Sequence, residues 1–166
     1  LYVYNRFLSL NEVGGDPRTF GLSLEEFHRF LRRRSRDWPH AMNATSTHDS
    51  KRGEDVRARL NVLSEIPERW GDSVTRWSRI NASHKQPIDG QAAPDRNDEY
   101  LLYQTLVGAL PFEESEYDGF TQRVKDYMIK AVREAKTHSD WGQPNEPYEG
   151  ACLRFIEQIL DRTPDN

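Results

Sequence analysis

The chain has 166 residues, of which 36% are hydrophobic and 30% are charged, and its formal net charge at pH 7 is −4. This length suits about one domain. The negative charge argues against non-specific nucleic-acid binding, which needs a basic surface, and no stretch approaches the run of about 18 apolar residues in a membrane span.

The single cysteine, Cys152, excludes an internal disulfide bond. It falls on the apolar face of a predicted helix, so we expect a buried structural thiol rather than a nucleophile. The absence of a disulfide framework favours a reducing compartment. We therefore expect a cytoplasmic protein.

The segment 1–10 is apolar from its first residue, and Leu1, Tyr4 and Leu8 recur at helical spacing. We expect a helix here that ends at Gly14-Gly15. Whole proteins rarely begin inside a core element, so we expect the chain to be an excised piece of a larger protein.

Residues 23–36 carry strong helix signals. Ser23 and Glu26 form a predicted capping box, and Leu24, Phe27 and Leu31 form an apolar face that we expect to be buried. The arginines at positions 32–36 are expected to be solvated and to favour the negative end of the helix dipole. A nucleic-acid-binding patch is the alternative, and the acidic net charge disfavours it.

A short extended segment follows the Trp38-Pro39 break. We predict a strand over residues 40–46 and a helix over residues 53–65. The apolar face of this helix comprises Val56, Leu60 and Leu63. On its other face, Asp55 and Arg59 lie four residues apart and are expected to pair.

The rest of the chain predicts four more helices and two loops. The helices cover residues 67–80, 98–110, 120–135 and 148–159, and the loops cover 84–94 and 137–147. The class is mainly α with one or two short strands, and it holds too few strands to close a (β/α)₈ barrel of about 250 residues. We treat 1–166 as one helical fragment with a strand–loop–helix segment at 40–65 and a downstream helical part at 95–163.

An adjacent imidazole and carboxylate, His48 and Asp49, directly follow the predicted strand. Such a pair can bind sugar hydroxyls and stabilise positive charge on a sugar ring. A simpler interpretation stays open, because Asp49 or Ser50 could cap the next helix and His48 could be an ordinary surface histidine.

Two interpretations also stay open for the charged residues that follow, and solvated charge is the favoured one. Lys51 and Arg52 could contact an anionic partner or a sugar, or could pair with Glu54 and Asp55 as solvated charge. Trp141, in a loop with Pro and Asn, suits a sugar-stacking platform or a loop anchor packed on the core. Residues 97–99 could bind sugar hydroxyls, but acids and Asn at a helix start favour a capping role.

The string from Thr45 to Glu65 resembles the fourth conserved segment of the α-amylase superfamily (glycoside hydrolase family 13) and, within it, the maltooligosyltrehalose synthase family. Further segments in matching order extend the likeness over nearly the whole chain. They are residues 4–6, 10–17, 97–106, 123–136, 139–141 and 144–149.

The resemblance implies that the chain comes from the C-terminal part of the catalytic region, the last part of a (β/α)₈ barrel plus helical decoration. It implies an isomerase that moves the reducing-end α-1,4 bond of a maltooligosaccharide to α-1,1 without metal or organic cofactor, in trehalose biosynthesis. Asp49 would be the transition-state stabiliser, and His48, Lys51, Arg52 and Trp141 would contact substrate.

No string in the chain resembles the segments that carry the family's nucleophile and acid/base. We therefore expect the fragment alone to be inactive, since retaining glycosyl transfer needs both carboxylates. We also expect that surface facing the missing barrel half could allow self-association. A helical protein-interaction module without catalytic activity is the alternative function.

Overall fold

The structure is a computed structural model that describes residues 2–163, apart from the side chain of residue 118. Its helices are α1 (Leu24–Asp37), α2 (Glu54–Val62), α3 (Pro67–Ile80), α4 (Arg96–Ala109), α5 (Phe120–Ala135) and α6 (Glu146–Ile159). One antiparallel sheet contains β1 (Gln86–Ile88) and β2 (Gln91–Ala93). The predicted mainly α class is confirmed. Among the described residues, no helix combines the length and the apolar character that crossing a membrane requires.

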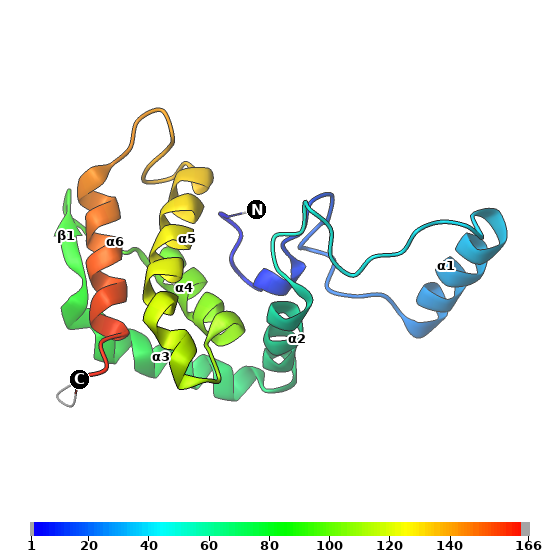
Figure 1. Ribbon diagram of the computed structural model, residues 1–166, viewed down its shortest axis with the longest axis horizontal. Coiled ribbons are helices and arrows are strands. Elements are labelled where there is room, and N and C mark those ends of the chain that lie inside the picture. Colours follow the sequence, from blue (N-terminus) through cyan, green and yellow to red (C-terminus); the bar gives the residue numbers. More distant parts are fainter. Residues whose placement is uncertain (1, 164–166) are drawn as a thin grey trace.

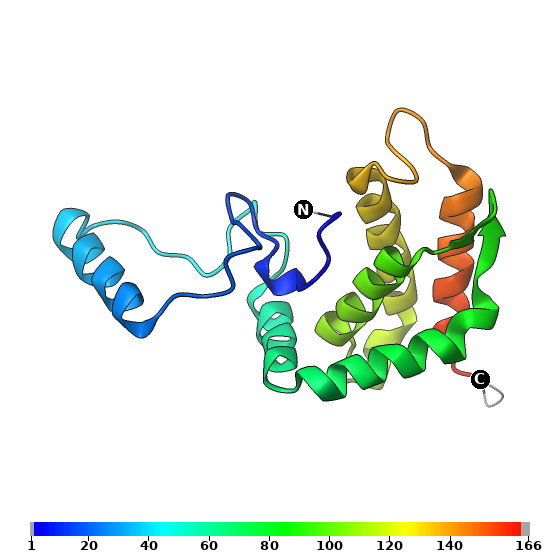
Figure 2. The ribbon, with the colours of Figure 1, turned by 180° about the vertical axis from the view of Figure 1, so that it is seen from behind.

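The molecule consists of a helical body and a long projecting arm. Figure 1 shows α3, α4, α5 and α6 in the body, α2 at its side, and α1 at the far end of the arm. Seen from behind, α3 runs along the body from α2 towards the β-hairpin (Figure 2). Two extended segments lead out to α1 and back, so the arm leaves and rejoins the body beside α2.

Helix α4 lies at the centre of the body, as its nearly continuous apolar pattern predicts. Leu101, Leu102 and Gln104 are at most 1% exposed. The core also receives side chains from α2, α5 and α6. They are Leu60, Phe120, Val124, Met128, Ala131, Val132, Ala151, Cys152, Phe155 and Ile156. Cys152 is buried as predicted, and this burial raises the pKa of its thiol.

Helix α2 and the 3₁₀ turn that follows it (Leu63–Glu65) bury the predicted face of Val56, Leu60 and Leu63 in the core beside α4. The predicted Asp55–Arg59 pair is wrong. The Arg59 guanidinium donates to the carbonyl oxygen of Leu110 at 2.8 Å and lies over the Phe112 ring instead. Arg59 thus satisfies carbonyls at the end of α4, where helix carbonyls lack partners within the helix.

The loop predicted over residues 84–94 contains a β-hairpin. Asp89 and Gly90 both have positive φ, at 50° and 80°, and Ile88 pairs with Gln91 across the turn. An Asp-Gly pair between two short extended runs is the usual signal of a type I′ hairpin. The Asp89-Gly90 pair therefore predicts a hairpin, although the high content of Pro, Gly and Gln in this segment favours a loop.

The helix predicted near the N-terminus is wrong within the described residues, and Leu1 lies outside them. Only Leu8–Leu10 form a 3₁₀ turn. The Gln104 side chain accepts a hydrogen bond from the Leu8 amide at 2.9 Å and donates to the Asn5 carbonyl at 2.7 Å. Helix α4 thus satisfies backbone groups that an N-terminal helix would have paired internally.

Helix α1 forms where the sequence predicts it, with the capping box of Ser23 and Glu26. The expected burial of its apolar face is wrong, because Leu24 is 78% exposed, Phe27 46% and Leu31 41%. The local signals that start a helix act within α1 itself, whereas burial needs a partner. The described part of the chain places no other element against this face (Figure 1).

The strand predicted over residues 40–46 is also wrong in this structure. The segment is extended and exposed, and the only sheet in the described residues is the β1–β2 hairpin. It is held by side chains, with Arg34 donating to the Met42 carbonyl and Thr45 donating to Glu54. A strand needs a neighbouring strand to pair its backbone groups, and residues 2–163 place none beside this segment.

Candidate functional site

His48 and Asp49 occupy a tight turn between the arm and α2. The Ser50 amide donates to the Thr47 carbonyl at 3.1 Å, and the Thr47 amide donates to the Ser50 hydroxyl at 2.9 Å. The Asp49 amide donates to the Thr47 hydroxyl at 3.3 Å. Short polar side chains therefore fix the backbone of the turn and leave the Asp49 carboxylate out of these bonds.

Neither Asp49 nor Ser50 caps the helix that follows. The N-cap of α2 is Gly53, and no side chain accepts from its first amides. The capping interpretation of Asp49 is therefore wrong. The Asp49 side chain is 65% exposed and His48 91%, and their carboxylate oxygen and Nε2 lie 3.5 Å apart. Both groups are accessible to a ligand.

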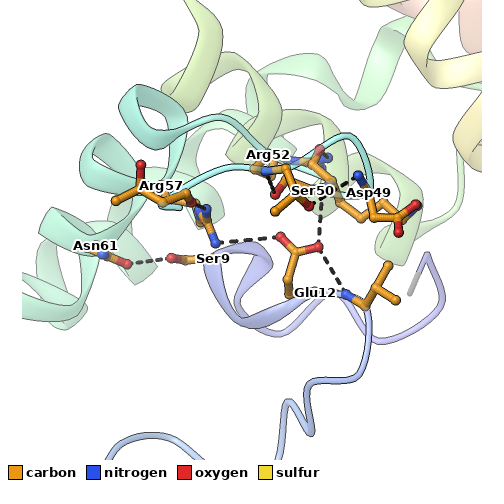
Figure 3. Close-up of polar contacts among 11 residues, drawn as sticks. Ser9, Glu12, Asp49, Ser50, Arg52, Arg57 and Asn61 are labelled. Carbon is orange, nitrogen blue, oxygen red and sulfur yellow. Dashed lines mark hydrogen bonds and ion pairs between the residues drawn. The ribbon is translucent and has the colours of Figure 1, made fainter. Parts of the chain in front are cut away.

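The segment after Asp49 is attached to the rest of the molecule on two sides. On one side, the Glu12 carboxylate accepts from the Lys51 amide at 3.2 Å and lies 3.5 Å from the Arg57 guanidinium. Figure 3 shows Glu12 between the N-terminal segment and this loop, with the Asp49 carboxylate directed away from it. The loop that presents Asp49 is thus tied to residues far away in sequence.

On the other side, Arg52 reaches α5. Its guanidinium donates to the Tyr127 hydroxyl at 2.5 Å and lies 4.8 Å from the centre of the Tyr127 ring. Burial raises the pKa of Tyr127, an effect that the nearby Arg52 charge partly opposes, so the phenol stays neutral at physiological pH. The expected alternative of a pair between Arg52 and Glu54 is not formed: Arg52 donates to Tyr127, and Glu54 accepts from Thr45.

A cavity of about 220 Å³ opens beside this loop. Lys51, Arg52 and Arg123 contribute three cationic side chains to it, and Phe120 and Tyr127 contribute aromatic rings. Mixed aromatic and polar linings suit ligands that carry both apolar faces and hydroxyl groups. Lys51 and Arg52 therefore line one cavity, while His48 and Asp49, just before them in the chain, are not part of its lining.

Trp141 lies in the loop after α5 and is not brought to this cavity. Its side chain is 55% exposed, its Nε1 donates to Glu134 at 3.2 Å, and the Arg133 guanidinium lies 5.0 Å from its ring centre. Tyr127, which meets Arg52, is eight residues before the end of α5, about 12 Å along a helix. Trp141 is held by polar and cationic neighbours rather than packed in the core.

The acids at the start of α4 have structural roles that the sequence did not indicate. Asp95 is the N-cap, since its side chain accepts from the Asp98 amide at 2.7 Å. Asp98 and Glu99 are only 4% and 3% exposed. Glu99 accepts from Lys85 at 2.7 Å and from Tyr103 at 2.8 Å. The expected capping role belongs to Asp95, and residues 98 and 99 are buried polar links.

Asp95, Asp98 and His138 form a cluster whose ligand atoms lie within 4.8 Å of one another. Each already has a protein partner. His138 Nε2 lies 2.8 Å from Asp95, and the Tyr148 hydroxyl donates to Asp98 at 2.6 Å. Burial raises the pKa of Asp98. The chemistry of this donor set is that of a hydrogen-bond network joining α4, α6 and the loop between α5 and α6.

Comparison with known proteins identifies close relatives, although no family model matches the chain. A Mycobacterium tuberculosis protein, provisionally named maltooligosyl trehalose synthase, is 40% identical over 156 residues, which is 94% of this chain and 19% of that protein. The chain therefore spans about one fifth of the length of this relative.

Solved structures give the same result. A crystal structure of a hypothetical maltooligosyl trehalose synthase from Sulfolobus tokodaii is 39% identical with a TM-score of 0.80, covering 98% of this chain and 21% of that one. The maltooligosyltrehalose synthase of Arthrobacter ramosus is 34% identical with a TM-score of 0.81, covering 98% and 19%. Over nearly its whole length, the chain is therefore a homologue of one segment of the maltooligosyltrehalose synthases.

Proposed function

We propose that this chain is part of a larger enzyme that converts the reducing-end α-1,4 bond of a maltooligosaccharide into an α-1,1 bond, forming a terminal trehalose unit. Asp49 supplies the third carboxylate of that active site and stabilises the oxocarbenium-like transition state. The proposal rests on the family resemblance of residues 45–65 and on homology to the synthases over 94% of the chain.

The observation that carries the proposal is the exposure of Asp49 on a fixed turn. Its side chain is 65% exposed, while hydrogen bonds within residues 47–50 hold its backbone. A carboxylate that stabilises developing charge has to be preorganised and accessible to the sugar. A buried or capping aspartate could not fill this role.

The cavity beside the loop is suited to the sugar that leaves and returns. Lys51 and Arg52 would donate hydrogen bonds to its hydroxyls, and His48 would contact the same ring as Asp49. Trp141 would be a stacking platform for a more distant glucose unit, since its ring is exposed but lies beyond the end of α5. Exclusion of water from the closed site would favour transfer over hydrolysis.

The covalent steps need two further carboxylates, a nucleophile and an acid/base about 5 Å apart. In the resemblance, both lie in segments that this chain does not contain. The chain by itself is therefore proposed to be inactive, and the reaction belongs to the parent enzyme. Incubating the isolated chain with maltopentaose should give no non-reducing trehalosyl product, and formation of that product would refute this part of the proposal.

The decisive experiment replaces Asp49 in the parent enzyme. Asp49→Asn should lower kcat by about 10²-fold or more, because charge stabilisation in the transition state is lost. Asp55→Asn is the matched control, since Asp55 is a nearby exposed acid on α2 and should leave kcat unchanged. Wild-type activity of the Asp49→Asn enzyme would remove Asp49 from the mechanism.

The alternative, a helical interaction module without activity, has one supporting observation. Helix α1 exposes an apolar face that includes Leu24, Phe27 and Leu31. An excised segment would expose such a face where the rest of its enzyme normally packs. The exposed face is thus expected under both proposals, whereas the matching His48–Asp49 string favours the enzyme.

A further inference from the structure

We infer that Glu12 and Tyr127 are positioning residues that hold the Asp49 loop of the parent enzyme from opposite sides. This inference rests on the proposed function of Asp49 and extends it to residues without a role in the resemblance. Glu12 is not part of the cavity lining, and Tyr127 lines the cavity beside Arg52. Both act through the backbone and side chains of residues 51 and 52, which directly follow the turn that carries Asp49.

Glu12 joins three parts of the molecule. Its Oε1 accepts from the Lys51 amide at 3.2 Å and from the Val13 amide at 3.0 Å. Its Oε2 lies 3.5 Å from the Arg57 guanidinium, and these two side chains are only 28% and 26% exposed. Arg57 also donates to the Thr45 carbonyl. One carboxylate therefore links both flanks of the turn, and Figure 3 shows its contact with Arg57.

A turn that contains Gly14 and Gly15 positions Glu12 so that its side chain reaches the Asp49 loop. The Gly15 amide donates to the Glu12 carbonyl at 3.0 Å, and Gly14 between them has φ of 75°. This left-handed conformation at the third position of a turn strongly favours glycine. The sequence Glu12-Val13-Gly14-Gly15 thus fixes the backbone from which the Glu12 side chain reaches the loop.

Tyr127 holds the next residue from the opposite side. Its hydroxyl accepts from Arg52 at 2.5 Å, and its ring lies under the guanidinium with 4.8 Å from centroid to Cζ. Arg52 also donates to the Lys51 carbonyl at 3.1 Å. The Lys51 peptide is therefore held at its amide by Glu12 and at its carbonyl by the Arg52–Tyr127 pair.

The consequence for Asp49 follows from this double attachment. Asp49 is two residues before Lys51, too few to absorb a displacement of that peptide without moving. A displacement of about 1 Å at a reacting centre can lower the rate by about 10²-fold. We expect loss of either contact to lower kcat of the parent enzyme more than it changes KM.

The test uses Glu12→Ala, Glu12→Gln and Tyr127→Phe in the parent enzyme with maltopentaose. Glu12→Ala should lower kcat about tenfold to 10²-fold with a smaller change in KM. Glu12→Gln should restore part of the loss, because an amide oxygen can still accept from Lys51. Tyr127→Phe removes the hydroxyl and keeps the ring, and should lower kcat less than Glu12→Ala does.

Matched controls come from a similar cluster elsewhere in the chain. Glu114 pairs with Arg162, whose guanidinium lies 4.4 Å from the Tyr117 ring centre. Glu114→Ala removes a carboxylate–guanidinium pair of the same kind, and Tyr117→Phe removes a tyrosine hydroxyl while keeping the ring beside an arginine. Both positions are far from Asp49 in sequence, and both variants should keep kcat. Hydrogen exchange of a peptide covering residues 48–53 provides a readout that does not depend on turnover. Exchange should be faster in Glu12→Ala than in Glu114→Ala.

The possible outcomes separate this inference from the proposed function. If Asp49→Asn is inactive while Glu12→Ala and Tyr127→Phe match their controls in kcat and exchange, the positioning role is overturned and the function of Asp49 stands. If Asp49→Asn keeps wild-type kcat, both proposals fail. Equal loss of kcat in Glu12→Ala and Glu114→Ala, with equal exchange, would indicate general destabilisation and overturn the inference.

Discussion

Gly108 of α4 lies directly against Val56 of α2. A Cβ atom added at Gly108 would be 2.6 Å from Val56 Cγ1 and 3.7 Å from Leu60 Cγ. Real side chains do not approach that closely, so the absence of a side chain at position 108 lets the two helices meet. No sequence motif indicates this contact, because a single glycine within a helical pattern does not reveal which residue packs against it.

We predict that Gly108→Ala destabilises the chain despite the better helix propensity of alanine. Alanine gains about 1 kcal/mol in a helix interior, while overpacking a filled core costs about 1–3 kcal/mol. Thermal or urea unfolding should show a net loss of up to about 2 kcal/mol. The double variant Gly108→Ala, Val56→Ala should recover part of it, because the second change removes the clashing atoms.

Gly71→Ala in α3 is the control for this prediction. An added Cβ there meets nothing within 4 Å, so alanine should stabilise by about 0.5–1 kcal/mol. Equal stabilisation by both substitutions would mean that α2 and α4 do not touch at Gly108.

The second prediction concerns Gln104, whose buried side chain pairs backbone groups that an N-terminal helix would have paired internally. It is 0% exposed, and Asn5 is 2% exposed. Gln104→Leu would leave the Leu8 amide and the Asn5 carbonyl without the partners at 2.9 and 2.7 Å. Each unpaired buried group costs about 1–3 kcal/mol, so we expect a loss of about 2–6 kcal/mol in urea unfolding.

Gln122→Leu tests whether loss of a glutamine hydrogen bond alone has this effect. Gln122 is exposed on α5 and donates to Asp126 at 2.7 Å. Its replacement should change stability by less than about 0.5 kcal/mol. A Gln104→Leu variant as stable as Gln122→Leu would show that water satisfies the freed backbone groups.

The third prediction concerns pH. Two hydrogen bonds from Arg133, at 2.8 and 2.7 Å, hold the pKa of Glu149 below its ordinary value of 4.5, and the Ser139 hydroxyl contributes in the same direction. A carboxylate whose pKa is lowered by folding stabilises the native state fully above the ordinary pKa. This contribution is lost as pH falls through the lowered pKa of the folded state.

We therefore expect the melting temperature of the wild-type chain to fall as pH drops below about 4.5, and to fall less steeply in Arg133→Met. Arg29→Met is the control, because its partner Glu25 is 80% exposed and should not alter the slope. Burial raises the pKa of Asp98, which has the opposite sign, so the comparison between variants isolates Glu149. Parallel curves for wild type and Arg133→Met would contradict the prediction.

The sequence predicted those elements whose signals are local. The capping box of Ser23 and Glu26, the proline that opens α3 and the apolar faces of α2, α5 and α6 all act within one turn or one helix face. The N-terminal segment failed, because Leu8 and its neighbours are paired by a side chain from α4, about 100 residues later in the chain. Periodicity cannot reveal such a partner.

The sequence predicts which residues form the candidate site, but only part of their arrangement in space. The resemblance identified His48 and Asp49, and the exposure of both fits that prediction without testing their role. It did not indicate Glu12 or Tyr127, whose contacts depend on the three-dimensional closeness of distant segments. The buried face expected for α1 and the strand expected over residues 40–46 both need partner elements, and the described chain places none beside them.

The hydrogen bond between Glu12 and Lys51 connects residues 39 apart in sequence, at the point where the arm departs and returns. The segment from residue 12 to residue 51, which includes α1, therefore forms a closed loop whose two ends are held together. Insertions or deletions within it, at a closure cost that grows only slowly with length, need not shift either end. Evolution could therefore change the length of this segment freely, while Asp49, beside its joined ends, keeps its position.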